Sequence, residues 1–343
     1  MGEVLSDKDI SNGVSLPRQI RVSVGAAIAL GLFKGKLDAE PTTAYLMTYK
    51  TGKCTANCTF CPQARSSQSK AELLSRVTWP VFSTTDVLKR LSRVVEGKKI
   101  KRVCVQALNY PEVFDDVCAV VEQLKKQVRV PISVSCQPLN SKNLWRLHRA
   151  GADRIGIALD AATEELFCKV KGATVDGPYK WEDQLRLLQV AIGVFGEGNV
   201  STHLIIGLGE TESEAVASIQ KCVDWGVLPA LFAFTPVAGT ARALCNQPKV
   251  DVYRRVQMAR YLIANGIARS GDISFDEEGR IVDFGVTKTL LVRITESGEP
   301  FLTSGCPDCN RPFYNEKPRG PIYNYPRSLT KNEIAQIRKE LEL

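Results

Sequence analysis

Strand-like and helix-like segments alternate along most of this 343-residue chain. Short apolar runs rich in β-branched residues indicate strands, and apolar stripes at helical spacing indicate helices between them. The strand-like runs lie near residues 43–49, 101–107, 131–136, 154–160, 200–206 and 230–236. This alternation favours an α/β fold with a parallel sheet and helical crossovers. Six such units predict a partial (β/α)6 TIM-type barrel, open on one side, with its chemistry at the carboxyl ends of the strands.

Local signals place helices and boundaries around this barrel. Capping boxes at Thr211–Glu214 and Thr330–Glu333 predict helix starts, and Gly151 follows a helical pattern as a C-terminal stop. The apolar segment Val22–Phe33 is too short to span a bilayer and predicts a buried helix. We therefore expect three parts: an N-terminal helical extension (1–40), the barrel (41–270) and a C-terminal extension (271–343).

Composition narrows the class of protein. Charged residues precede any apolar stretch at the N-terminus, so no signal peptide is expected and the protein is predicted to be cytoplasmic, without membrane association. Eleven cysteines in such a chain favour reduced thiols and metal ligation over disulfides. The net charge of +8 would favour an acidic partner, but the basic residues are scattered among 37 carboxylates, so nucleic acid is not expected.

Three cysteines, Cys54, Cys58 and Cys61, follow the first strand-like run with the spacing C-x3-C-x2-C. Thiolates suit iron, and three of them can hold a 4Fe-4S cluster while its fourth iron stays free for another ligand. Alternatives are a zinc knuckle lacking one ligand and three ordinary thiols. The pattern resembles the radical S-adenosylmethionine (SAM) superfamily, whose members use this vacancy to bind SAM. The resemblance also implies that the backbone at Phe60 lies near the adenine of SAM.

A second element of that resemblance lies in the segment Leu204–Glu210. On its own it is a strand, a glycine turn and a helix start, which is a common crossover. In the superfamily a similar fifth-strand motif packs on the adenine, which implies this role for Ile205, Gly207 and Glu210. His203 stands where that motif has its first glycine.

Two further positions bear on SAM binding. Asp160 ends the fourth strand-like run, where a carboxylate either accepts hydrogen bonds from a ribose or caps the next helix. Resemblance to biotin synthase, which ends this strand in Asn-Leu-Asp, supports the ribose role, with Ala158 replacing the asparagine. The superfamily's second-strand glycine-glycine-glutamate element is absent, and Ala107–Tyr110 occupies its place, so another group must bind the methionine amino group.

The resemblance to biotin synthase extends to Cys61–Gln63 and to Gly239–Thr240. It also implies that Cys104 and Cys136 correspond to positions where that family holds a second, sulfur-donating cluster. The family's third cysteine would fall near Ser201, so a complete 2Fe-2S cluster of that type is not expected. Buried cysteines that act as small hydrophobes are the other interpretation.

The C-terminal extension carries Cys306 and Cys309 as a C-x2-C pair. Two cysteines cannot satisfy a metal alone and need partners from elsewhere. Cys104 or Cys136 would complete the set if this extension folds over the barrel. We therefore predict a second, auxiliary 4Fe-4S cluster, with zinc or a redox-active pair as alternatives.

Together these motifs resemble one component of the two-protein lipoyl synthases. The resemblance implies sulfur insertion at C6 or C8 of an octanoyl chain on a lipoyl carrier domain, either the glycine-cleavage H protein or an E2 type. It also implies a sister lipoyl synthase component and an electron donor of the ferredoxin or flavodoxin type. Two other functions stay open: a one- or two-cluster biotin synthase-like radical SAM enzyme acting on a small molecule, and a non-catalytic iron–sulfur or zinc protein.

Overall fold

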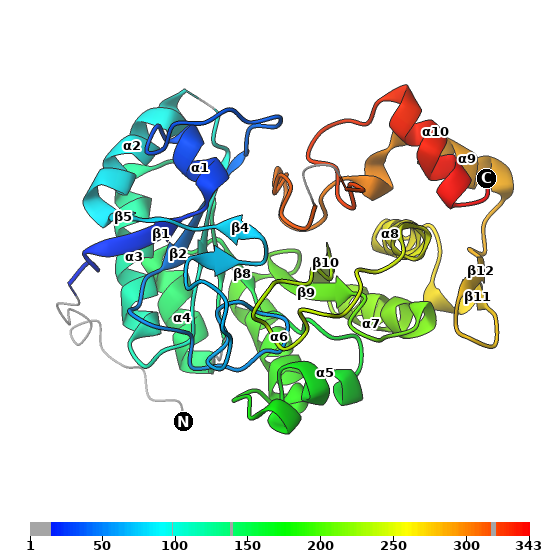
Figure 1. Cartoon of the computed structure of the whole chain (residues 1–343), viewed down its shortest axis with the longest axis horizontal. Helices are drawn as coiled ribbons and strands as arrows, with labels where there is room; N and C mark the ends of the chain where they lie inside the picture. Colours follow the sequence, from blue (N-terminus) through cyan, green and yellow to red (C-terminus); the bar gives the residue numbers. More distant parts are fainter. Residues whose placement is uncertain (1–14, 98, 138–139, 317–319) are drawn as a thin grey trace.

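A computed structural model describes residues 15–97, 99–137, 140–316 and 320–343; the first fourteen residues of the predicted N-terminal extension lie outside this range. Six parallel strands form the centre of the fold, each beginning within three residues of a strand predicted from the sequence. They are β2 (Thr43–Thr48), β6 (Arg102–Gln106), β7 (Ile132–Ser135), β8 (Arg154–Gly156), β9 (Val200–Ile206) and β10 (Val227–Ala233). They pair in the order β10-β9-β8-β7-β6-β2. The predicted α/β partial TIM-type barrel is confirmed (Figure 1).

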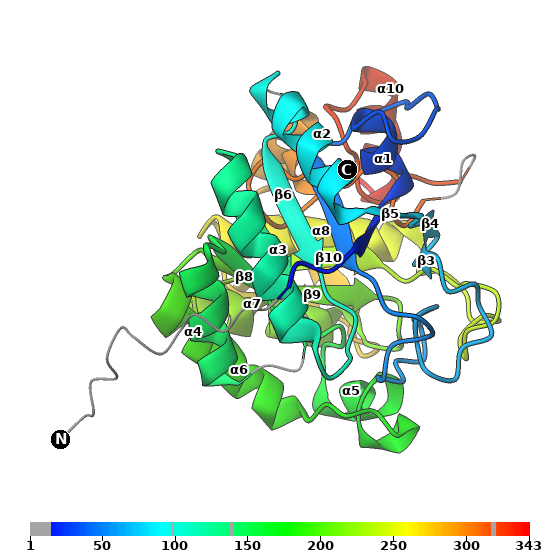
Figure 2. The same cartoon turned by 90° about the vertical axis from the view of Figure 1, so that its left-hand side faces the viewer.

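Helices cover the outer face of this curved sheet, as Figure 2 shows for α2, α3 and α4. The helices between and after the parallel strands are α2 (Thr84–Glu96), α3 (Val113–Gln127), α4 (Ser141–Ala150), α5 (Glu164–Val170), α6 (Trp181–Phe195), α7 (Glu212–Asp224) and α8 (Val250–Ala264). The predicted capping boxes are confirmed at α7 and at the C-terminal helix α10 (Lys331–Glu340). Gly151 ends α4 at φ 107°, a left-handed conformation that costs glycine little.

Alternation along the strands separates the core from the barrel interior. In β6, Val103 and Val105 are fully buried, while Cys104 and Gln106 between and after them face the interior and are less buried. In β7, Ser133 and Ser135 face the interior in the same way, and Ile132 and Val134 pack outward. Because side chains alternate between the two faces of a strand, every second residue is available to a site inside the barrel.

The N-terminal segment combines a strand with a helix. We predicted a buried helix over Val22–Phe33, whereas the structure has β1 (Gln19–Val22) followed by the short helix α1 (Val24–Ala29). β1 pairs antiparallel with β2 on one side and with β5 (Val81–Ser83) on the other. Ile20 and Val22 are buried in the core, and Arg21 between them is buried too, because β1 is covered by strands on both sides. Within the described residues, the main sheet therefore has eight strands.

The C-terminal extension crosses the open side of the barrel. It contains β11 (Ser274–Phe275), β12 (Ile281–Asp283), α9 (Lys288–Ser297), the 3-10 turn η3 (Glu299–Phe301) and α10. Four short elements lie outside the extension: the hairpin strands β3 (Leu73–Leu74) and β4 (Val77–Thr78) and the 3-10 turns η1 (Ala173–Val175) and η2 (Ser270–Asp272). The loop after η3 binds the last strand, where Ser304 Oγ accepts the backbone N–H of Leu231 at 2.8 Å. It binds next to the first strand as well, where Asn310 Oδ1 accepts the N–H of Thr42 at 2.9 Å. The extension thus bridges the two ends of the open barrel.

A buried arginine anchors the extension to α8. The Arg254 guanidinium is 2% exposed and donates to Glu340 Oε2 of α10 at 3.1 Å and to the backbone oxygen of Tyr323 at 2.7 Å. It also lies over the rings of Phe301 and Tyr325. In the part of the chain that the structure describes, no helix is long and apolar enough to cross a membrane.

Candidate functional site

The first cysteine set (Cys54, Cys58 and Cys61) lies on the loop that leaves the carboxyl end of β2, as predicted. Cys54 Sγ accepts the backbone N–H of Asn109 at 3.1 Å, and this residue follows the neighbouring strand β6. Cys61 N–H donates to Cys58 O at 3.1 Å, which closes a turn between the last two cysteines. All three thiols are free and half-buried. The loop therefore brings three thiols to the sheet edge at which barrel enzymes carry their chemistry.

Side chains within the loop fix its shape. Lys53 Nζ donates to the backbone oxygens of Pro62 and Ser69, each at 2.6 Å. Gln63 is 1% exposed, and its amide donates to the backbone oxygens of Ala71 at 2.6 Å and Leu73 at 2.5 Å. These bonds tie the cysteine loop to the segment before β3. The Cys-Pro-Gln sequence therefore has a structural use in this chain, which is to hold the loop closed around its thiols.

Burial in the loop disfavours thiolates that no cation balances. Burial raises the pKa of the Cys58 thiol strongly and that of the Cys61 thiol to about 12. Iron ions would supply the positive charge that stabilises thiolates here. Among the described residues, no group of three or more His, Cys, Asp or Glu side chains is arranged to hold a single metal ion. A cluster has a different requirement, because each of its thiolates binds a separate iron.

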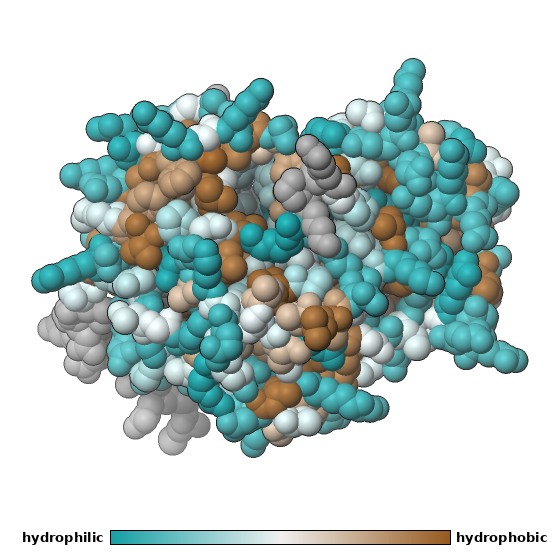
Figure 3. All heavy atoms as spheres, viewed as in Figure 1, coloured by the Kyte–Doolittle hydropathy of each residue, from teal (hydrophilic) through white to brown (hydrophobic). Residues whose placement is uncertain are grey.

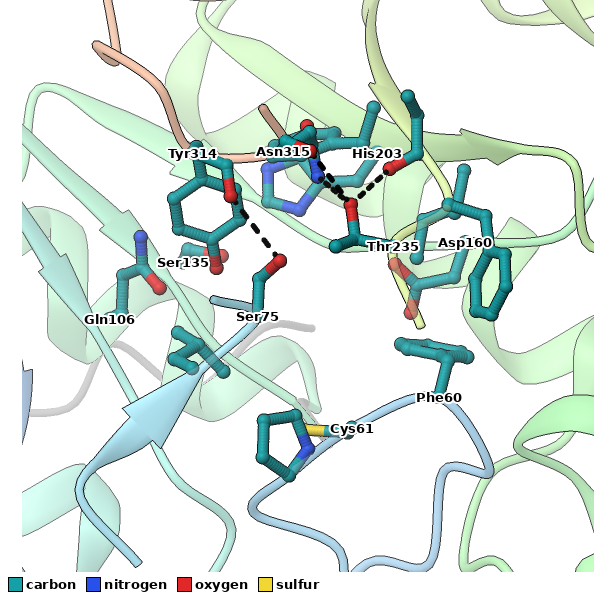
Figure 4. A pocket seen from close by; sticks show the side chains of 16 residues that line it. Phe60, Cys61, Ser75, Gln106, Ser135, Asp160, His203, Thr235, Tyr314 and Asn315 are labelled. Carbon is teal, nitrogen blue, oxygen red and sulfur yellow. Dashed lines mark hydrogen bonds between the residues drawn. The ribbon is translucent and has the colours of Figure 1, made fainter. Parts of the chain in front are cut away.

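The predicted cofactor residues meet around one cavity. Phe60, Cys61, Asp160 and Ile205 line a cavity of about 170 Å³, and Figure 4 shows the first three around this space. They come from the cysteine loop, the end of β8 and β9. His203 lines the same cavity, and burial lowers its pKa to about 4, so the imidazole is neutral at pH 7.

Gly207 and Glu210 lie in the turn that follows β9. The Glu210 carboxylate turns back onto its own loop and accepts the N–H groups of Gly207 at 2.6 Å, Leu208 at 3.1 Å and Gly209 at 3.2 Å. Gly207 has φ 101°, and a Cβ there would lie 2.7 Å from Pro248. Neither residue lines the cavity, so both shape the turn that follows Ile205.

Asp160 is held by a buried lysine that the sequence analysis missed. Its Oδ2 lies 2.7 Å from Lys171 Nζ, which also donates to Ala158 O and Gln137 Oε1, each at 2.9 Å. Lys171 is 1% exposed. Asp160 does not cap α5, because Thr163 does so. The capping alternative is therefore excluded, and the carboxylate faces the cavity with one side bound to the ammonium group.

A second cysteine set (Cys104, Cys306 and Cys309) comes together inside the barrel. Cys104 lies in register between Tyr45 of β2 and Ser133 of β7. The Tyr45 hydroxyl is 3.1 Å from Cys309 Sγ, and the Ser133 hydroxyl is 3.5 Å from Cys306 Sγ. The pKa of the Cys104 thiol is raised mainly by burial, and negative charge on Cys306 and Cys309 would raise it further. The three thiols are thus neighbours and could hold a second cluster.

Cys136 does not join this set. It follows β7 on the outward face and is 3% exposed. Burial is the main reason why the pKa of its thiol is raised, and the nearby Cys118 of α3 raises that pKa further. Of the two partners that the sequence offered for Cys306 and Cys309, the geometry favours Cys104. Cys136 has the environment of a small buried hydrophobe.

Two arginines lie beside the second cysteine set. Arg102 Nε donates to Pro307 O at 3.2 Å, within the Cys306–Cys309 turn, and another of its nitrogens donates to Ser133 Oγ at 3.0 Å. The Arg311 guanidinium lies 3.7 Å from the ring centre of Phe232. Both cations oppose the rise in the pKa of Cys104. Their charge would stabilise an anionic, thiolate-rich cluster at this place.

Tyr314 lies between the two cysteine sets. It lines the cavity that Cys61 also lines, and its ring packs edge-on against Phe232 at 5.8 Å between ring centres. Burial raises the pKa of its hydroxyl, and charge on Cys61 and on Cys104 would each add to that effect. The cavity therefore lies between the first cysteine set, near the carboxyl ends of the strands, and the second cysteine set, deeper in the barrel.

A partial (β/α)6 barrel with three thiols on the loop after its first parallel strand defines a class of enzymes that start radical reactions at an iron–sulfur cluster. The profile of the radical SAM superfamily matches residues 48–222, just over half of the 343 residues. The chain belongs to this superfamily. Its members use a 4Fe-4S cluster and SAM, and the first cysteine set is where this chain would hold such a cluster.

Similar proteins include biotin synthases. The chain is 25% identical to biotin synthase of Cytophaga hutchinsonii over 304 residues, which is 83% of each chain. It is 23% identical to biotin synthase 2 of Corynebacterium diphtheriae over 242 residues, and the match spans just under two thirds of that protein's length (66%) and 65% of this chain.

Solved structures support the fold. Methylornithine synthase has a TM-score of 0.50 and 14% identity over 64% of this chain and 62% of its own. A maturase of the FeFe-hydrogenase has a TM-score of 0.52 and 14% identity over 65% of this chain and half (50%) of its own. At such low identity these likenesses concern the fold alone.

Proposed function

We propose that the protein is a radical SAM sulfurtransferase of the lipoyl synthase type. Its reaction would insert sulfur at C6 or C8 of a protein-bound octanoyl chain, in lipoate biosynthesis, together with a sister protein. The observation that carries this proposal is the second cysteine set, which lies inside the barrel across the cavity from the first. A radical enzyme that only rearranges its substrate needs no second set of thiols within reach of the reacting carbon.

The two clusters would supply different chemistry. When bound, the first supplies an electron, taken from a ferredoxin- or flavodoxin-type donor, that cleaves SAM to methionine and a 5'-deoxyadenosyl radical. The second would be the source of sulfide. Each new carbon–sulfur bond would replace one carbon–hydrogen bond, the hydrogen would leave in 5'-deoxyadenosine, and the remaining electron would stay with the iron that gave up its sulfide.

The residues of the chain have the task of positioning and shielding. Asp160, fixed by Lys171, presents a carboxylate oxygen to the cavity and suits the hydroxyl groups of a ribose. Phe60 and Ile205 offer apolar contacts to an adenine ring. Phe232 and Tyr314 cover the space between the two cysteine sets. Such a lining excludes water, which protects a carbon radical from side reactions.

The substrate class is supported by chemistry and by the relatives. Biotin synthases, the relatives by name, make a sulfur-containing cofactor, and a lipoyl group likewise carries sulfur on an aliphatic chain. The net charge of +8 suits an acidic carrier such as an H protein or E2-type lipoyl domain. The cytoplasmic location predicted from the sequence agrees with this role. The second candidate is a biotin synthase-like enzyme that inserts sulfur into a free small molecule.

A comparison of substrates and variants tests the proposal. Reconstituted protein would be given SAM, reductant and an octanoylated H protein, and thiol-containing product and 5'-deoxyadenosine would be measured by mass spectrometry. We expect carrier-dependent product from wild type and none from a Cys306→Ala/Cys309→Ala variant. Cys245→Ala, at an exposed cysteine, is the matched control and should behave as wild type. Unchanged sulfur transfer by the double variant would refute the role of the second set, and activity only on free acids would favour the second candidate.

A further inference from the structure

A second, larger cavity opens beside the second cysteine set. It measures about 450 Å³, within the range of roughly 300–1,000 Å³ that is usual for small-molecule sites. Most of its walls come from three parts of the chain that are distant in sequence: the region of α1 up to Pro41, the β3–β4 hairpin and the C-terminal extension. Its apolar lining includes Leu37, Val77, Trp79, Pro312, Phe313 and Ile322. No residue of the first cysteine set lines it.

The inner end of this cavity reaches the second cysteine set. Tyr45 lines the cavity, and its hydroxyl is 3.1 Å from Cys309 Sγ. Arg311 also lines it and lies over Phe232, which belongs to the wall of the smaller cavity. Tyr314 lines both cavities. The two spaces are therefore separated by a thin wall of side chains, of which Tyr314 is one.

The outer end of the cavity reaches the surface. Asp38, one of its lining residues, is exposed, and Leu37 and Ala39 beside it are half-exposed. Figure 3 shows a hollow in the surface between the region of α1 and the C-terminal extension, with hydrophobic atoms gathered on the α1 side. A mostly apolar cavity that extends from the surface to the second cysteine set suits an unbranched aliphatic chain better than a compact polar molecule.

We infer that this cavity is the channel through which a medium-length acyl chain, attached to a carrier at the surface, reaches the second cysteine set. The inference rests on the proposed function for the identity of the acyl group, but the channel can be tested by binding alone. Asp38, which is exposed, then lies where the polar link between acyl chain and carrier passes. Tyr314 has to yield for the chain to extend from the larger cavity into the smaller one.

Gly25 offers a way to block the channel without damage to the fold. It lies in α1 and lines the cavity, and a Cβ added there meets no atom within 4 Å. Leucine also favours helix more than glycine does, and the position has room for its Cβ, so Gly25→Leu adds bulk to the cavity wall. Gly193 in α6 is the matched control, because it is helical, exposed and equally open to an added Cβ. Ala39→Leu narrows the channel from another wall.

The experiment measures binding of fluorescent lysine peptides that carry acetyl, butanoyl, hexanoyl or octanoyl groups, by anisotropy, to reconstituted protein. Burial of a methylene contributes roughly fourfold in affinity, so wild type and Gly193→Leu should bind more tightly as the chain lengthens. Gly25→Leu and Ala39→Leu should bind the octanoyl peptide about tenfold more weakly or worse, with iron content unchanged. No dependence on chain length in wild type, or wild-type binding by Gly25→Leu, overturns the channel.

A parallel assay separates this inference from the proposed function. Sulfur insertion into the octanoyl peptide is followed for the same variants. One outcome is that binding depends on chain length and is abolished by Gly25→Leu, while wild type inserts no sulfur. This outcome supports the channel and refutes the proposed function. The opposite outcome is that Gly25→Leu inserts sulfur at the wild-type rate. This outcome supports the proposed function and overturns the channel.

Discussion

The hydroxyl of Tyr45 and the thiol of Cys309 lie 3.1 Å apart, although 264 positions separate them in the sequence. Tyr45 is in the first parallel strand, and Cys309 is in the C-terminal extension. The same hydroxyl accepts the backbone N–H of Arg311 at 3.1 Å, so its own proton is available to the sulfur. This contact brings the C-terminal cysteines into the barrel beside Cys104.

Removal of this hydroxyl should change the second cluster alone. A hydrogen bond to a ligating sulfur raises the reduction potential of a cluster, so Tyr45→Phe should make the potential of the second cluster more negative. It also leaves the Arg311 N–H unpaired, at a cost of about 1–3 kcal/mol in stability. Potentiometric titration followed by electron paramagnetic resonance measures the shift. Tyr261→Phe, in which a half-buried tyrosine loses its solvent-exposed bond to Glu299, is the control. A potential equal to that of wild type would argue against this contact.

Lys171 should be essential to SAM binding and to stability. Lys171→Met leaves the Asp160 carboxylate in a buried site without its cation, and loss of one partner of a buried ion pair costs about 3–5 kcal/mol. We expect a lower melting temperature and a higher KM for SAM. Lys169→Met is the control, since its pair with Glu165 is exposed and should contribute little. Calorimetry and 5'-deoxyadenosine kinetics check both effects; equal behaviour of the two variants would refute the role of Lys171.

Arg254 should hold the C-terminal extension on the barrel. Arg254→Met removes the buried pair with Glu340 and the bonds to the segment before Tyr325, at a cost of about 3–5 kcal/mol. Limited proteolysis should then cut within the extension, and iron at the second site should fall while iron at the first stays. Arg338→Met, whose pair with Glu296 is exposed, provides the comparison. Loss of iron from both sites together would instead indicate general unfolding.

His203 should make stability depend on pH. Burial lowers its pKa from 6.5 to about 4, so between these values the unfolded chain binds a proton that the folded chain does not. The free energy of unfolding therefore falls as pH drops through 6.5 towards 4. From pH 7 to pH 5 this contribution is on the order of 2 kcal/mol. Urea unfolding at both pH values should show a smaller difference for His203→Gln than for wild type. His148→Gln, at the other histidine, should retain the wild-type difference.

Much of the barrel could be predicted because its signals are local. Apolar runs predicted all six parallel strands, and the spacing of Cys54, Cys58 and Cys61 led to the proposed first cluster site. The strand β1 was missed because its pattern is only four residues long, and its burial depends on pairing with β2 and β5. A short apolar run does not distinguish strand from helix.

The second site was harder to predict, although part of its signal was present. In Ile132–Cys136 the apolar residues alternate with serines, which puts Cys136 on the outward face with Ile132 and Val134. That alternation could have excluded Cys136 in favour of Cys104. Lys171 had no such signal, because its contact with Asp160 depends on the path of the loop after α5.

Iron and sulfide analysis with Mössbauer spectroscopy tests the central claim most directly. Wild-type protein would be reconstituted without oxygen beside two triple alanine variants, one at Cys54, Cys58 and Cys61 and the other at Cys104, Cys306 and Cys309. Two 4Fe-4S sites predict about eight irons in wild type and about four in each variant, with SAM cleavage lost only in the first. About four irons in wild type, all retained when the second set is replaced, would contradict the account.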